Sequence, residues 1–290
     1  MSISMDFLLS SLADGLLLGF VYGVAAMGLT LIWGVMDVIN LSHGPIIALG
    51  MYGIYFLFND GMGLNPYISL LLVAVFGLLL GILIYMVAVH RVINAPHLST
   101  LLATFSVNMI IIGLGTAFLS TVPRNVNFSL GSVSLGPVTL PVTRLIAALA
   151  AMIAAGALYL FLYRTRPGRY IRAVTDNRSA AELVGVPSTS ILALSFGLGT
   201  MLAALSGGLI STFFSFSILS GGRYELKSFV IGVLGGLGNP IGALLGGLIL
   251  GVLEGIIPAF IETSWVPVIE FGLFIVILLV RPSGLFGAKQ

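Results

Sequence analysis

Long apolar segments restrict more than any other feature how this chain can fold. An α-helix needs roughly 20 apolar residues to cross the hydrocarbon core of a bilayer. Five segments reach or approach that length: residues 12–35, 66–89, 101–120, 142–163 and 191–213. The chain therefore predicts an all-α integral membrane protein, and we expect one domain over residues 1–290.

Four further apolar segments are shorter. Those at residues 241–257 and 266–280 are long enough to span the membrane where the bilayer is thinned or where other parts of the protein surround them. Those at residues 41–58 and 224–237 are rich in Gly or bounded by Pro, which is typical of half-helices that line an enclosed cavity. The sequence predicts a polytopic bundle of about eight to ten transmembrane helices, with nine as the central estimate.

Composition excludes several other classes of protein. Of 290 residues, 58% are hydrophobic and 8% are charged, whereas about a quarter are charged in soluble domains. Too little polar surface remains to cover a core in water, which excludes a soluble enzyme, a disordered chain and a nucleic-acid binder. Cys is absent and the three His residues lack the paired spacing of a zinc site, so we predict no thiolate nucleophile and no metal site. We assign no catalytic residue to this chain.

The basic residues predict the orientation in the membrane. With nine spans the connecting loops alternate between two sides. One set of loops holds Arg91, Arg164, Arg166, Arg169, Arg172, Arg178, Arg281 and Lys289, and the other holds Arg124, Arg223 and Lys227. Because Lys and Arg favour cytoplasmic loops, the first set is expected inside. The N-terminus is then outside and the C-terminus is cytoplasmic.

Glycines recur at helical spacing in three rows. The rows are Gly15, Gly19 and Gly23; Gly238, Gly242 and Gly246; and Gly247, Gly251 and Gly255. Small residues four apart let apolar helices approach closely. They indicate either packing within this bundle or a face for a second subunit.

A nucleotide site is not predicted on this chain. Residues 221–228 look superficially like a phosphate loop, but Leu226 occupies the place of the Gly that must precede Lys227.

Ionisable residues near the spans are candidates for function, because a charge at the bilayer centre costs about 2.5–3.5 kcal/mol on insertion scales. They are Asp14, Asp37, Glu254 and Glu270, with His43 close by in sequence. They favour either a proton relay or solvated and hydrogen-bonded structural roles.

A possible pathway segment surrounds His43. Pro45 follows Asn40, Ser42, His43 and Gly44, so we expect helical structure to be interrupted there. The interruption would leave backbone N–H and C=O groups free to form other hydrogen bonds. His43 is interpreted as a capping or packing residue, with a substrate ligand as the alternative. We name these four residues and Glu270 as possible pathway residues.

Two loops stand out by their polarity. Residues 121–141, expected outside, alternate polar and apolar side chains around Gly131 and Gly136, which favours a small β-hairpin. Residues 164–190, expected inside, are the longest polar stretch, and Pro167 with Gly168 is expected to form a turn after the preceding helix.

A short amphipathic helix is predicted inside the second loop. Asp176 or Asn177 is a suitable N-cap, and Gly185 followed by Pro187 is a stop signal. Ala180, Leu183 and Val184 share one face at helical spacing. Because so short a helix has little stability alone, it must pack on its own bundle or dock into a cytoplasmic subunit.

Several blocks of sequence, in order along nearly the whole chain, resemble the permease subunits of ABC importers for branched-chain amino acids, the LivH and LivM type. Residues 28–34 read GLTLIWG and residues 38–44 read VINLSHG, similar to the first-helix signature and the NFAHG motif of that family. Residues 168–177 read GRYIRAVTDN, residues 234–243 read LGGLGNPIGA and residues 281–287 read RPSGLFG. Length favours the LivH half, although Ser179 stands where the wider importer loop pattern has Glu.

The resemblance implies a function and a set of partners. The chain would form the pathway of an ATP-driven importer in a prokaryotic inner membrane, beside a second permease of the LivM type or a second copy. Two cytoplasmic ATPases would carry ATP and Mg, this chain would carry no cofactor, and an extracytoplasmic binding protein would deliver a hydrophobic amino acid. The resemblance places the contact with the ATPases on one stretch of the loop: Arg169, Arg172, Asp176, Asn177, Ala180, Ala181, Leu183, Val184 and Gly185.

Three alternatives remain open. Related permeases handle urea and short amides, and the pathway has no ion-pair fingerprint for one substrate. A proton-coupled secondary transporter or a channel would need no ATPase. A purely structural membrane subunit would carry no flux.

Overall fold

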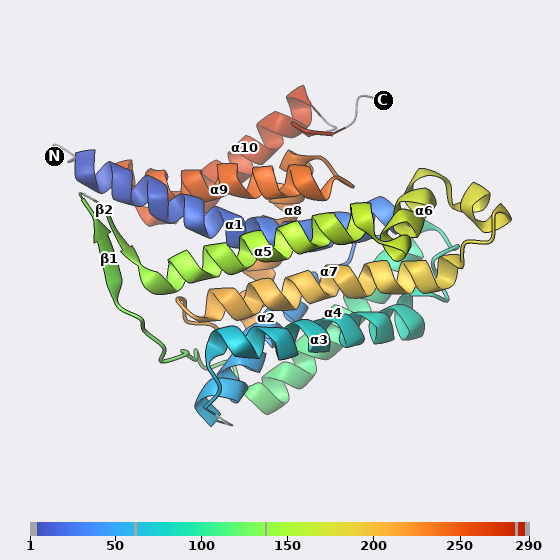
Figure 1. The fold of residues 1–290 in the computed structure, drawn as a ribbon, viewed down its shortest axis with the longest axis horizontal. Coiled ribbons are helices and arrows are strands. Elements are labelled where there is room, and N and C mark those ends of the chain that lie inside the picture. The colour runs from blue at the N-terminus through green and yellow to red at the C-terminus, as the bar shows by residue number, and fades with distance from the viewer. Residues whose placement is uncertain (1–4, 61–62, 137, 282–283, 288–290) are drawn as a thin grey trace.

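The fold is a bundle of long helices with two short helices in its interior, as a computed structural model of the chain shows (Figure 1). The structure describes residues 5–60, 63–136, 138–281 and 284–287. Lys289, one of the basic residues used to predict the orientation, lies outside the described residues.

Seven helices within the described residues are long and apolar enough to cross a membrane. They are α1 (Met5–Met36), α3 (Pro66–Ile84, continued by a π-helix at Tyr85–Val89), α4 (His97–Leu119), α5 (Val142–Arg164), α7 (Ser188–Ser211), α9 (Pro240–Phe260) and α10 (Val266–Val280, preceded by a 3₁₀ turn at Thr263–Trp265). The prediction of an all-α, polytopic membrane protein is confirmed.

The two ambiguous segments form short helices. They are α2 (His43–Tyr55, continued by a π-helix at Phe56–Asp60) and α8 (Gly221–Gly235, preceded by a 3₁₀ turn at Ile218–Ser220). At 1.5 Å per residue, their 13 and 15 residues are too short for a hydrocarbon core of about 30 Å. Both are mostly buried, as expected of short helices enclosed by longer ones.

The glycine rows pack helix against helix inside the chain. Gly15, Gly19 and Gly23 of α1 face Gly247, Gly251 and Gly255 of α9 so closely that backbone meets backbone: a Cβ built on Gly15 would lie 2.9 Å from Gly255 Cα. The row Gly238, Gly242 and Gly246, just before and at the start of α9, meets Gly34 of α1 and the C-terminal half of α8. The structure thus places all three rows within one bundle.

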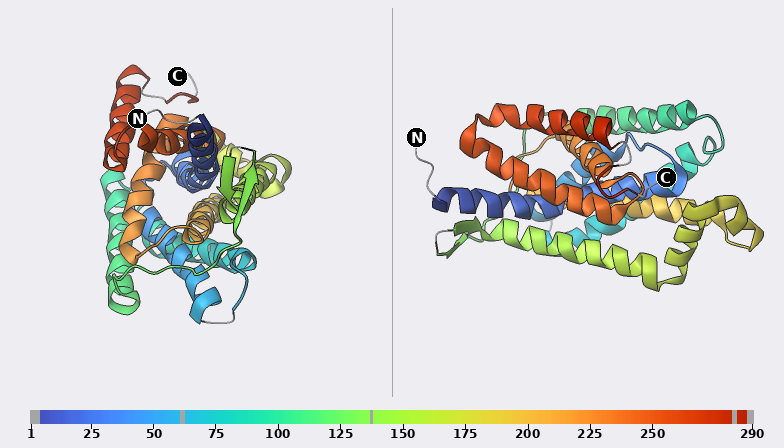
Figure 2. Two further views of the ribbon diagram at one scale, coloured as in Figure 1. Left: turned by 90° about the vertical axis from the view of Figure 1, so that its left-hand side faces the viewer. Right: turned by 90° about the horizontal axis from the view of Figure 1, so that it is seen from above.

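Helices α4 and α10 lie at the periphery and expose most of their apolar side chains, which suits contact with lipid (Figure 2). The core is formed chiefly by α1, α2 and α7.

Two polar features lie at opposite ends of the bundle (Figure 1). At one end, with the start of α1, is the predicted hairpin: β1 (Ser132–Leu135) pairs antiparallel with β2 (Val138–Pro141), from Ser132 opposite Pro141 to Leu135 opposite Val138. At the other end is α6 (Arg166–Leu183), within the predicted cytoplasmic loop. We call these the hairpin end and the α6 end.

Candidate functional site

Helix α6 starts earlier than the sequence predicts. Thr165 is extended and its hydroxyl accepts a hydrogen bond from Gly168 N at 3.1 Å, so Thr165 caps the helix and Pro167 lies in its first turn. The expectation of a turn at Pro167 and Gly168 is wrong, because Pro is well tolerated where the first N–H groups have no intrahelical partner.

The predicted short helix exists as the second half of α6. Asn177 leaves helical geometry, with φ −160° and ψ 103°, and its Oδ1 accepts a hydrogen bond from Ala180 N at 2.9 Å. Residues 178–183 then form the short helix. Gly185 has φ +84°, Gly185 N donates to Glu182 O at 3.0 Å, and Val186 N donates to Ala181 O at 3.0 Å. This is the Schellman arrangement that a glycine after a helix favours.

The short helix exposes an apolar face. Leu183 is 89% exposed and Val184 is 80% exposed, and Ala180 beside them is exposed too. Ala181, by contrast, is 4% exposed and packs into this chain. The grouping of Ala181 with the docking residues is therefore corrected: a side chain turned into its own bundle cannot reach a partner, and Ala181 instead holds the helix against the bundle.

Ionic contacts also hold the short helix in place. Arg178 Nε lies 3.0 Å from Glu182 Oε1, one helical turn away, and Arg178 also donates to Asn94 Oδ1 at 3.2 Å. Its hydrogen bond with Arg178 lowers the pKa of Glu182 below the usual value. The pair is thus formed at neutral pH and is lost only as acid protonates Glu182.

The other predicted loop residues lie along α6. Arg172 lies 4.6 Å over the Tyr163 ring and donates to Leu162 O at 3.2 Å, so it ties α6 to α5. Arg169 and Asp176 are exposed to the surroundings.

The possible pathway segment is a buried break between α1 and α2. Asn40 Oδ1 accepts hydrogen bonds from Ser42 N at 3.1 Å and from Ser42 Oγ at 2.6 Å, and His43 Nε2 lies 3.0 Å from Ala25 O. Within the described chain, Asn40 Nδ2 and His43 Nδ1 have no hydrogen-bond partner. His43 thus packs α2 against the middle of α1, which fits the packing interpretation, and two buried polar atoms of the segment are left available.

Helix α8 carries charged residues whose importance the sequence did not reveal. Glu225 lies against Gly44, since its Oε2 would be 2.7 Å from a Cβ there. Lys227 pairs with Glu254 at 2.5 Å and lies 3.6 Å from Glu270. The prediction of orientation counted Lys227 as a loop residue. The structure corrects this, because Lys227 lies within α8. The signal was present as Glu225 and Lys227 in the mostly apolar segment 224–237, but only the tertiary structure brings the partners of Lys227 from α9 and α10.

Six charged residues surround one cavity of about 700 Å³ near the hairpin end, which we call the charged cavity. They are Asp14, Arg144, Arg223, Lys227, Glu254 and Glu270. Asp14 and Arg144 form an ion pair. Glu270 therefore lies beside residues of α1, α8 and α9 and contacts Lys227 directly. His43, with which the sequence analysis grouped Glu270, does not line this cavity.

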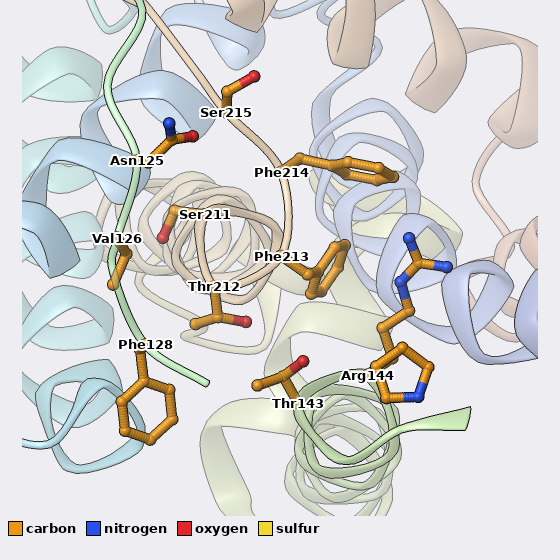
Figure 3. Close-up of a pocket in the computed structure, with 11 residues that line it drawn as sticks. Asn125, Val126, Phe128, Thr143, Arg144, Ser211, Thr212, Phe213, Phe214 and Ser215 are labelled. Atoms are coloured by element: carbon orange, nitrogen blue, oxygen red, sulfur yellow. The ribbon is translucent and has the colours of Figure 1, made fainter. Parts of the chain in front are cut away.

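A second cavity of about 350 Å³ adjoins it and shares Arg144 and Phe214 (Figure 3). Asn125, Val126 and Phe128 lie along one side of this pocket, and Phe213, Phe214 and Arg144 lie along the other. The Arg144 guanidinium lies 5.6 Å and 5.3 Å from the two ring centroids, which are cation–π contacts.

Metal-binding groups do not cluster: in the residues that the structure describes, no three of His, Cys, Asp and Glu come together.

Known proteins similar to this chain were identified by comparison. A family model described as "Branched-chain amino acid transport system / permease component" matches residues 11–278. The chain is 30% identical over 306 residues to the high-affinity branched-chain amino acid transport system permease protein LivH of Escherichia coli, with 98% of this chain and 97% of that protein covered. It is 29% identical over 300 residues to the corresponding protein BraD of Pseudomonas aeruginosa, with 97% and 96% covered.

A sugar permease is also similar. The fructose import permease protein FruG of Bifidobacterium longum is 30% identical over 274 residues, with 88% of this chain and 76% of that protein covered. No solved structure matches the chain.

Proposed function

The chain belongs to the family of branched-chain amino acid transport permeases, and we propose that it forms the translocation pathway of an ATP-driven importer for branched-chain or other hydrophobic amino acids. The observation that carries this proposal is the family match, which extends over residues 11–278 and so covers all or most of each of the seven apolar helices in the described residues. As a permease the chain transports and does not catalyse.

The proposed partners follow from the same premise. A second permease subunit, of the LivM type or another copy, completes the pathway, and two cytoplasmic ATPases bind ATP and Mg. An extracytoplasmic binding protein delivers substrate at the hairpin end. The ATPases dock at the α6 end of the protein in a prokaryotic inner membrane, with the N-terminus outside.

The short helix of α6 supports this coupling role. It presents Leu183 and Val184 to the surroundings while Asn177, Gly185 and the Arg178 contacts hold its position. An exposed apolar pair on a rigid, capped helix suits an interface that must transmit movement, because a firmly held helix moves with its bundle.

ATP-driven uptake in proteoliposomes tests the function. We expect vesicles that contain this chain, its permease partner and the ATPases, together with the binding protein, to accumulate radiolabelled leucine. Accumulation should require ATP on the side of the membrane that carries the ATPases. Unlabelled isoleucine should compete, whereas urea, acetamide and fructose should not. Uptake driven by a proton gradient without ATP would establish a secondary transporter, and competition by urea alone would establish an amide permease.

A further inference from the structure

In the charged cavity two ion-paired carboxylates each keep an oxygen without a hydrogen bond, and one cation, Arg223, has no ion pair among the described residues. Glu270 is 3% exposed, and its Oε1 lies 3.6 Å from Lys227 Nζ but accepts no hydrogen bond in the described part of the chain. Asp14 is paired with Arg144 through Oδ2, and its Oδ1 accepts no hydrogen bond there either. A buried carboxylate oxygen that accepts no hydrogen bond is energetically costly. Both oxygens can therefore accept a hydrogen bond from an N–H or O–H group of a ligand. Arg223 lines the same cavity and forms no ion pair among the described residues.

The charges of the cavity balance. Its three cations, Arg144, Arg223 and Lys227, match its three anions, Asp14, Glu254 and Glu270. A bound cation or anion alone would leave an unbalanced charge in the cavity. A zwitterion leaves the balance unchanged and supplies both a donor and an acceptor.

The rest of the lining is largely apolar. Leu18, Leu226, Pro258, Val266 and Phe271 all contribute to it. Such a wall suits an aliphatic side chain, whereas a sugar or urea would find few neutral polar partners beside it.

We propose that the charged cavity is a binding site for a zwitterionic amino acid with an apolar side chain. Glu270 Oε1 accepts a hydrogen bond from the ammonium group, and Arg223 donates to the carboxylate. Lys227 stays paired with Glu254 and orients Glu270. This inference rests on the proposed function and deepens it, because it assigns substrate contacts to residues of this chain.

Protection of an introduced cysteine tests the site in the assembled importer. Leu226 lines the cavity and is 54% exposed, and the chain has no cysteine of its own. We expect leucine to slow modification of Leu226→Cys by a thiol reagent, and urea and fructose to leave it unchanged. Leu219→Cys, which is 55% exposed and outside the cavity lining, is the matched reporter that leucine should not protect.

Two charge removals in the Leu226→Cys background test the assigned contacts. Glu270→Gln and Arg223→Gln should each raise the leucine concentration for half protection by at least about tenfold, because each removes a charge-assisted hydrogen bond. Arg223 is exposed and unpaired in the described chain, so its variant should fold even if Glu270→Gln does not. Glu262→Gln makes the same change on an exposed carboxylate outside the cavity and should have no effect.

The outcomes separate the site from the function. If wild-type importer takes up leucine but leucine does not protect Leu226→Cys, or if Arg223→Gln leaves protection unchanged, the site is rejected and the function stands. If the wild-type importer shows no ATP-driven leucine uptake, the proposed function itself fails.

Discussion

At the scale of single residues, the ends of the short helix in α6 depend on two backbone positions. Asn177 breaks the helix and caps the next one, and Gly185 ends it with φ +84°. The left-handed region costs a residue with a side chain about 1–2 kcal/mol, and more if that side chain is β-branched. Gly185 has no atom within 4 Å of a built Cβ, so backbone strain and not space restricts this position.

Gly185→Val should therefore loosen the end of the short helix and reduce the ATP hydrolysis that the liganded binding protein stimulates. Gly185→Asn should have a milder effect, since Asn tolerates the left-handed region. Both variants should insert normally into the membrane and, once purified, should elute as the wild type does in size-exclusion chromatography. Gly156→Val, at an open position within α5, is the control. Equal hydrolysis by the Val and Asn variants would show that the conformation of Gly185 is unimportant.

At the scale of elements, the contact between α1 and α9 relies on the absence of side chains. A Cβ on Gly251 would collide with Gly15 O and with Gly19 Cα. Backbone atoms cannot move aside as the end of a flexible side chain can, so the helices would have to separate.

Gly251→Ala should destabilise the protein by about 1–3 kcal/mol through overpacking. Gly113→Ala on α4 is the matched control, because nothing lies within 4 Å of its built Cβ. The fraction of protein that stays monodisperse in detergent after heating measures the difference. Identical heat resistance in the two variants would contradict close packing of α1 on α9.

The exposed pair on α6 permits a second prediction at this scale. Leu183→Glu and Val184→Glu each place a charge where we expect an apolar contact, and losing one buried aliphatic side chain costs about 1.5–3 kcal/mol. Association with the ATPases should weaken about tenfold to a hundredfold, measured by copurification at graded ATPase concentrations. Val133→Glu on the hairpin, where Val133 is 41% exposed, should not change it. Wild-type association of both α6 variants would exclude this face as the docking contact.

At the scale of the whole molecule, the hairpin and α6 lie at opposite ends of the bundle, so one of them faces the cytoplasm (Figure 1). The α6 end carries Arg164, Arg166 and Arg169 on or beside α6, all exposed. Arg91 lies in the loop whose Asn94 contacts Arg178, so it belongs to the same end. This distribution favours the α6 end as the cytoplasmic side.

Labelling of single cysteines in intact cells should confirm this orientation. An impermeant thiol reagent should modify Ser132→Cys and spare Ser179→Cys until the membrane is permeabilised. Both serines are exposed, whereas Ser188 is 5% exposed and would be a poor reporter. Modification of Ser179→Cys in intact cells would show that the α6 end faces outside. The basis for docking the ATPases on α6 would then be removed.

The sequence by itself determined the nine helical segments and the capped helix before Gly185. These features depend on apolar length and on residues within a few positions of one another, which are visible in a single chain. It did not determine that Ala181 faces inward while Leu183 faces outward, because amphipathic spacing defines a face without saying what covers it. Nor did it reveal the partners of Lys227, since Glu254 and Glu270 reach it only through the packing of α8, α9 and α10. Contacts across helices depend on how each helix is rotated about its axis, and that rotation is decided by packing in three dimensions.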